Sequence, residues 1–102
     1  MTEQEQLVLG KKEFESMQLL HSPCEISENV ARIRLAECWT SSHDESAFVV
    51  RLIDEAGNTL WRVSYPDEWH SGQELSAGAR AKALAVYLQN RCHCPLEESY
   101  LD

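Results

Sequence analysis

Three strand-length segments follow one another in the middle of the chain, separated only by short turns. From Val30 to Trp39, apolar and polar residues alternate, as in a strand with one buried and one solvent-facing side. Residues 47–53 and 59–65 form two further segments rich in aromatic and β-branched residues. The loop 54–58 contains a glycine, which is typical of a hairpin, and Pro66 ends the third segment because proline donates no ladder hydrogen bond. The pattern predicts an antiparallel three-stranded meander.

The alternation also assigns side chains to the two faces of this sheet. In the first segment one face carries Ala31, Ile33, Leu35 and Trp39, and the other carries Arg32, Arg34 and Cys38. The second segment is apolar on both faces, with Arg51 as its single charge. One layer of helices covers only one face, so we expect the N-terminal segment or another chain to cover the other. Self-association, including a homodimer, is therefore an expectation.

A C-terminal helix is predicted after the third strand. Two start signals precede it, a capping-box spacing over Ser71–Glu74 and a second capping residue at Ser76. Pro95 prevents the helix from continuing. Apolar or small residues then recur every three or four positions and form a stripe able to pack on the sheet, namely Ala77, Ala81, Leu84, Leu88 and Cys92.

A short N-terminal helix is predicted after Gly10, where apolar residues fall near helical spacing until Pro23 disfavours helix. At 102 residues the chain is expected to form a single domain, 1–102. The predicted fold class is α+β: a three-stranded antiparallel meander sheet packed against a C-terminal helix, with a short N-terminal helix.

Net charge limits the classes of partner. The chain has 17 acidic and 9 basic residues, a formal charge of −8. This balance argues against nucleic acid and against an anionic membrane, and it permits a partner protein with a basic surface. No apolar run approaches the roughly 18 residues of a membrane span, and the first residues do not resemble a secretory signal. We expect a cytoplasmic protein with reduced thiols.

Cysteine and histidine spacings raise the hypothesis of a metal site. His21 and Cys24 are spaced like a pair of zinc ligands, whereas the single-residue gap between Cys92 and Cys94 is too short. The sequence does not decide whether these four residues approach one another. Since Cys92 falls on the helix stripe, a packing role is favoured, and we expect no metal and no cofactor.

The most concentrated polar site is residues 67–70, where two carboxylates and an imidazole flank an indole. Such groups are able to form an acid–base pair, but a connection between strand and helix also carries them simply as solvated residues. No reaction follows from the sequence. We expect a small acidic interaction module, such as an inhibitor, an immunity-type protein or an adaptor, that covers a partner surface without catalysis.

Two sets of residues follow from these hypotheses. In the interaction module, loop carboxylates would steer the encounter and an indole would anchor it, through Asp44, Glu45, Asp67, Glu68 and Trp69. The alternative is a small-ligand-binding domain or small enzyme with a pocket between sheet and helix, if need be at a dimer interface. Its polar contacts would be Tyr65, Asp67 and His70.

Overall fold

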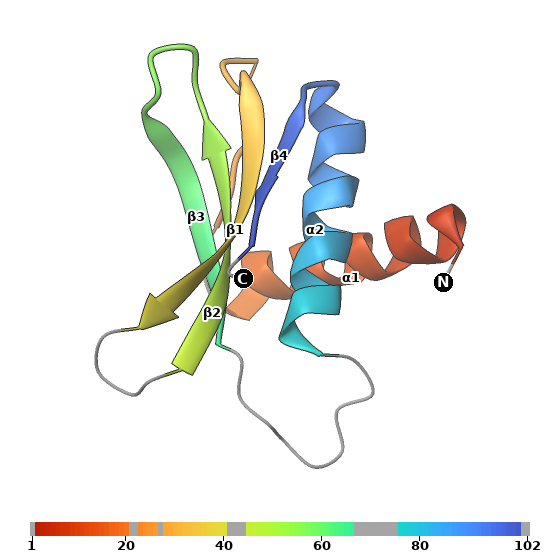
Figure 1. Cartoon of the computed structure of the whole chain (residues 1–102). Helices are drawn as coiled ribbons and strands as arrows, with labels where there is room; N and C mark the ends of the chain where they lie inside the picture. Colours follow the sequence, from red (N-terminus) through yellow and green to blue (C-terminus); the bar gives the residue numbers. More distant parts are fainter. Residues whose placement is uncertain (1, 21–22, 27, 41–44, 67–75, 101–102) are drawn as a thin grey trace.

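The computed structural model describes residues 2–20, 23–26, 28–40, 45–66 and 76–100 (Figure 1). In chain order the elements are α1 (Glu3–Leu20), β1 (Arg32–Thr40), β2 (Glu45–Ile53), β3 (Thr59–Pro66), α2 (Ala77–Cys92) and β4 (Leu96–Ser99). The fold class is α+β, as the sequence predicts.

The predicted meander is present, and a fourth strand extends it. β2 pairs antiparallel with β1 and with β3, whereas β4 pairs parallel with β1. The strand order is β3-β2-β1-β4, so the prediction of a purely antiparallel, three-stranded sheet is wrong. β4 has only four residues, Leu-Glu-Glu-Ser, and shows no apolar alternation that would identify it as a strand.

α2 begins at one of the two predicted positions. The Oγ atom of Ser76 accepts a hydrogen bond from the backbone N–H of Ala79 at 3.2 Å, which caps the helix. The other predicted start, Ser71–Glu74, lies outside the described residues. After Cys92 the chain leaves the helix through His93, which adopts the left-handed conformation with φ 53°.

The hydrophobic core lies between α2 and one face of the sheet. The helix contributes four buried members of the predicted stripe, and Cys92 packs against them while only partly buried. The strands contribute side chains that alternate along each of them, as predicted for Ile33 and Leu35 of β1. These core residues include Ala77, Ala81, Leu84 and Leu88 of α2, Ile33 and Leu35 of β1, Val50 and Leu52 of β2, and Trp61, Val63 and Tyr65 of β3.

α1 packs with its backbone close to α2, and it reaches the sheet through the side chains of Glu13 and Met17. Among the described helices and strands its backbone approaches only α2 (Figure 1). The helix runs through Gly10, so the prediction of a short helix beginning after this residue is wrong. A Cβ atom at Gly10 would overlap the carbonyl oxygen of Ala83 and lie 2.5 Å from the Cβ atom of Tyr87. Gly10 therefore permits the close approach of the two helices.

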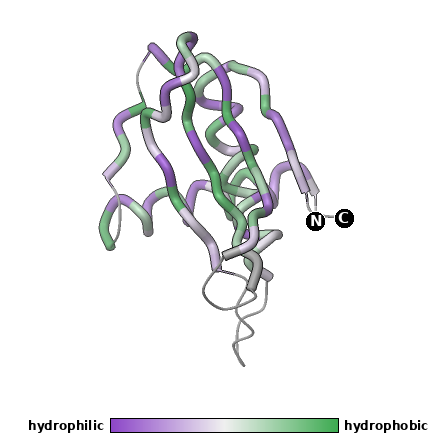
Figure 2. The backbone as a smooth tube through the Cα atoms, turned by 60° about the vertical axis from the view of Figure 1, so that its left-hand side comes forward, coloured by the Kyte–Doolittle hydropathy of each residue, from purple (hydrophilic) through white to green (hydrophobic). Residues whose placement is uncertain are grey.

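Neither helix covers the other face of the sheet. Figure 2 turns this face toward the viewer, with α2 behind the strands. Of the two coverings expected from the sequence, the N-terminal helix is thus ruled out by the position of α1. Trp39 was predicted on the buried side, but its side chain is 66% exposed at the end of β1.

Candidate functional site

Most of the predicted partner-binding side chains lie outside the described residues, namely Asp44, Asp67, Glu68 and Trp69. The backbone of Glu45 is described as the first residue of β2, opposite Thr40. Of the predicted ligand pocket, Asp67 and His70 also lie outside the described residues, and Tyr65 lies within them. The roles assigned to these residues stay predictions.

Tyr65 belongs to a buried polar cluster that joins α1, α2 and β3. Its side chain is 3% exposed, and its hydroxyl donates a hydrogen bond to Oε2 of Glu13 at 3.3 Å. Arg80 donates from Nε to Oε1 of Glu13 at 2.7 Å and from Nη2 to Oε2 at 3.2 Å. The Arg80 guanidinium also lies 5.3 Å from the centroid of the Tyr65 ring. This two-point contact is the strong geometry of an arginine–carboxylate pair.

The electrostatics of this cluster favour a structural role. Burial and the neighbouring carboxylate of Glu13 raise the pKa of Tyr65 above its usual value, so the phenol stays protonated. The hydrogen bond to Glu13 raises the pKa of Arg80, which stays charged. A pocket of about 360 Å³ lies beside the cluster, lined in part by Met17 and Arg62. Because the three polar groups bind one another, Glu13 is not free to act as a base toward a molecule in this pocket.

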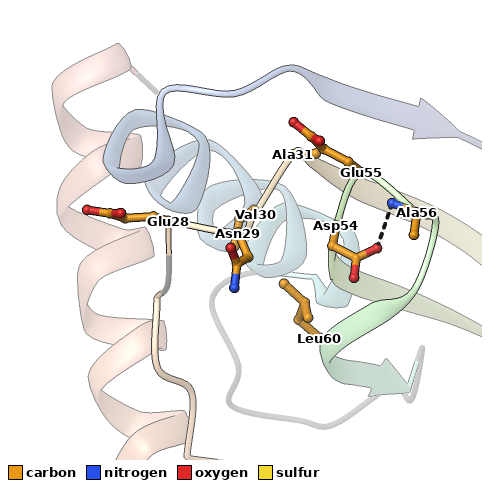
Figure 3. Close-up of a pocket in the computed structure, with 8 residues that line it drawn as sticks. All are labelled: Glu28, Asn29, Val30, Ala31, Asp54, Glu55, Ala56 and Leu60. Atoms are coloured by element: carbon orange, nitrogen blue, oxygen red, sulfur yellow. Dashed lines mark hydrogen bonds between the residues drawn. The ribbon is translucent and has the colours of Figure 1, made fainter.

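A second pocket, of about 380 Å³, lies where the β2–β3 hairpin meets the segment before β1 (Figure 3). Three acidic residues line it, but their carboxylates do not converge: Glu28 and Glu55 extend in different directions. Asp54 accepts hydrogen bonds from the backbone of Ala56 at 3.0 Å and of Asn58 at 2.8 Å. The hydrogen bond from Asn58 lowers the pKa of Asp54. Asp54 therefore fixes the hairpin loop.

Three of the four cysteines gather near the C-terminal end of α2. Cys24 is buried in the core, and Cys92 and Cys94 pack against the same core while partly buried. Burial raises the pKa of Cys24 to about 11, with a further contribution from Cys92. Burial likewise raises the pKa of Cys92 to about 11. His21 lies outside the described residues, and within the described part of the chain no three His, Cys, Asp or Glu side chains are placed to hold a metal ion.

These pKa values predict unreactive thiols at neutral pH. Because the thiolate is the nucleophile, a shift from 9.0 to about 11 lowers its population at pH 8 about 100-fold. We expect iodoacetamide to modify Cys24 and Cys92 about 100 times more slowly in the native protein than in urea, with the native rate rising toward pH 11. Peptide mass mapping after timed quenching measures each rate. Equal rates in native and unfolded protein would contradict this.

The sheet face opposite α2, hereafter the open face, carries an unusual arrangement of charge. In the strand register, Arg34 of β1 lies directly opposite Arg51 of β2, and Arg51 lies directly opposite Arg62 of β3. Residues directly opposite in antiparallel strands project to the same face, so these three arginines form one row, hereafter the arginine row. The sequence places Arg34 on the polar face of its strand, but only the register brings the three residues together.

Comparisons with protein-family models, with curated proteins and with solved structures find no match. Within the described part of the chain, no helix is long and apolar enough to cross a membrane.

Proposed function

We propose that this protein is a non-catalytic protein-interaction module that binds its partner through the open face. One observation carries the proposal: three arginines stand in register on a sheet face that neither helix covers. A half-buried antiparallel sheet needs a polar outer face, but it has no structural need for like charges directly opposite one another. An inhibitor, an immunity-type protein or an adaptor needs such a charged, uncovered surface to bind its partner.

The alternative of a small-ligand-binding domain or small enzyme has less support. Its predicted contact Tyr65 and the nearby Arg80 are both bound to Glu13. Native mass spectrometry of the purified protein tests this alternative. A small molecule retained at fixed stoichiometry would favour it, and a bare chain favours the interaction module.

Two copies are poorly suited to meet through their open faces. Such a contact would bring two arginine rows together, and like-charge juxtaposition across an interface is unfavourable. The edge strands β3 and β4 remain the route by which we would expect a homodimer to form.

Site-specific cross-linking tests the proposed surface. A benzophenone amino acid is placed at Ser64, which is exposed two residues from Arg62 on the open face, and in a matched control at Glu15, which is exposed on α1. After irradiation in the cells that naturally express the protein, we expect one identified protein cross-linked from Ser64 and not from Glu15. That protein, once purified, should bind the unmodified chain. Cross-linking from Glu15 alone, or from neither position, would overturn the proposal.

A further inference from the structure

The arginine row is closely spaced. Neighbouring strands lie about 4.8 Å apart, so the backbones of Arg34 and Arg62 are separated by about 10 Å with Arg51 between them. Arg32 lies two residues before Arg34 on the same face, in register with Ile53. Four of the six arginines in the chain therefore share one face of the sheet, in a protein whose formal charge is −8.

Among the described residues one carboxylate extends this row, because Glu97 of β4 lies opposite Arg34 in the parallel register and therefore on the same face. It forms no ion pair with Arg34, and no acidic side chain within the described part of the chain forms one with Arg51 or Arg62. The Nε atom of Arg32 lies 3.7 Å from Oε1 of Glu97 in β4. Because the two side chains are 42% and 51% exposed, this ion pair contributes little to stability. The Nε atom of Arg32 is buried and has no hydrogen-bond partner among the described residues. The face thus presents charge and hydrogen-bond donors that the described residues leave largely unpaired.

The neighbouring row on the same face consists of short side chains. Ala36, Val49 and Ser64 lie opposite one another in the register, one step along the strands from the arginine row. These side chains are short beside arginine, and Val49 is only 3% exposed, so a partner element lying over this row would contact the exposed Ser64 and the half-buried Ala36 rather than Val49. Such an element would bring its own side chains beside the guanidinium groups, whose planar donors suit carboxylates.

Building on the proposed function, we propose that the arginine row recognises an acidic helical segment of a partner protein, with Asp or Glu repeated along one face of the helix. Helix positions i, i+3 or i+4, and i+7 lie on one face and span about 10.5 Å along the axis, which matches the length of the row. In an extended strand, three carboxylates on one side would span about 13 Å and would fit less well.

Charge favours a protein segment over nucleic acid. A long polyanion would run beyond the row and meet a chain with 17 acidic residues, and repulsion acts over a Debye length of about 8 Å at physiological salt. A short acidic helix is confined to the row itself. The partner segment on this face is thus acidic, whereas net charge alone permits a partner with a basic surface.

The test uses a fluorescent helical peptide of about 20 residues with Glu at i, i+4 spacing on one face, and the same peptide with every Glu replaced by Gln. Binding to the full chain is measured by anisotropy. The triple variant R34Q/R51Q/R62Q is compared with K11Q/K12Q/R91Q, which removes the same charge from exposed residues of the two helices. We expect the first variant to weaken binding of the Glu peptide about tenfold or more and the second to change it less than about twofold.

Salt dependence and stability provide independent readouts. Raising NaCl from about 50 to about 300 mM should weaken binding of the Glu peptide, and the Gln peptide should not bind. Since removing opposed like charges relieves repulsion, R34Q/R51Q/R62Q should melt no lower than the unmodified protein, so its lost affinity is not unfolding.

Three outcomes would overturn the inference: no binding of the Glu peptide, equal loss in both triple variants, or tighter binding of a single-stranded DNA of about 20 nucleotides. The proposed function fails separately. If a partner cross-linked from Ser64 binds R34Q/R51Q/R62Q as well as it binds the unmodified chain, the open face is the interface and the acidic-helix assignment is wrong.

Discussion

Gly10→Ala is expected to destabilise the protein by at least about 2 kcal/mol, although alanine is the better helix former. In an exposed helix interior this change gains up to about 1 kcal/mol. At Gly10 the new methyl group would overlap the Ala83 carbonyl oxygen and would lie 2.5 Å from the Cβ atom of Tyr87, which is too close for two carbon atoms. α1 would have to move away from α2, and α2 is the only element its backbone approaches among the described helices and strands. Urea unfolding followed by circular dichroism measures the loss.

Gly78→Ala is the matched control, because Gly78 also lies in a helix. A Cβ atom there would lie 3.0 Å from the tip of the Phe48 ring, which is able to shift by a few tenths of an ångström. We expect a change within about 1 kcal/mol in either direction. If Gly10→Ala is as well tolerated as Gly78→Ala, the close helix crossing described here is wrong.

Glu13→Gln is expected to cost about 2 to 3 kcal/mol, since removing one partner of a largely buried ion pair leaves the other charge uncompensated. The Nε and Nη2 atoms of Arg80 donate hydrogen bonds to the Glu13 carboxylate at 2.7 Å and 3.2 Å. The Tyr65 hydroxyl also donates to this carboxylate. The Arg80 side chain remains 31% exposed, so water compensates part of the loss. The free energy of unfolding in urea measures the effect.

Two further variants test this assignment. Glu15→Gln removes the same charge from an exposed position of α1 and should change stability by less than about 0.5 kcal/mol. Adding Arg80→Met to Glu13→Gln should recover part of the loss, because an apolar side chain replaces an unpaired cation. The single variant Arg80→Met completes the comparison. If the double variant loses as much stability as Glu13→Gln and Arg80→Met lose together, Glu13 and Arg80 are not coupled.

The fold was largely predictable from local patterns. Alternation over β1 and β3 and the apolar stripe of α2 each reflect burial on a single face, which leaves a periodic signal in the sequence. The wrong predictions at Gly10 and at β4 have a common physical cause. Whether a glycine interrupts a helix or serves a helix crossing, and whether four polar residues form an edge strand, depends on the neighbour across space.

The candidate surface was less predictable than the fold. Alternation places Arg34 on the polar face of its strand, yet a single strand says nothing about which residue stands opposite. Arg51 and Arg62 join Arg34 in one row only because both hairpins adopt this register. Net charge did not indicate a partner with an acidic surface, because the total of −8 does not show the local excess of arginine on one face.

Methyl NMR tests most directly whether the open face is the binding surface. Val49 and Ile53 of β2 project toward the open face and are 3% and 5% exposed, so their methyl groups report on the layer directly under the arginine row, whereas Val8 and Leu19 lie exposed on α1. On titration with the Glu-bearing helical peptide, we predict chemical-shift changes at the methyl groups of Val49 and Ile53 and none at Val8 and Leu19. Changes at Val8 and Leu19, with Val49 and Ile53 unmoved, would contradict the claim.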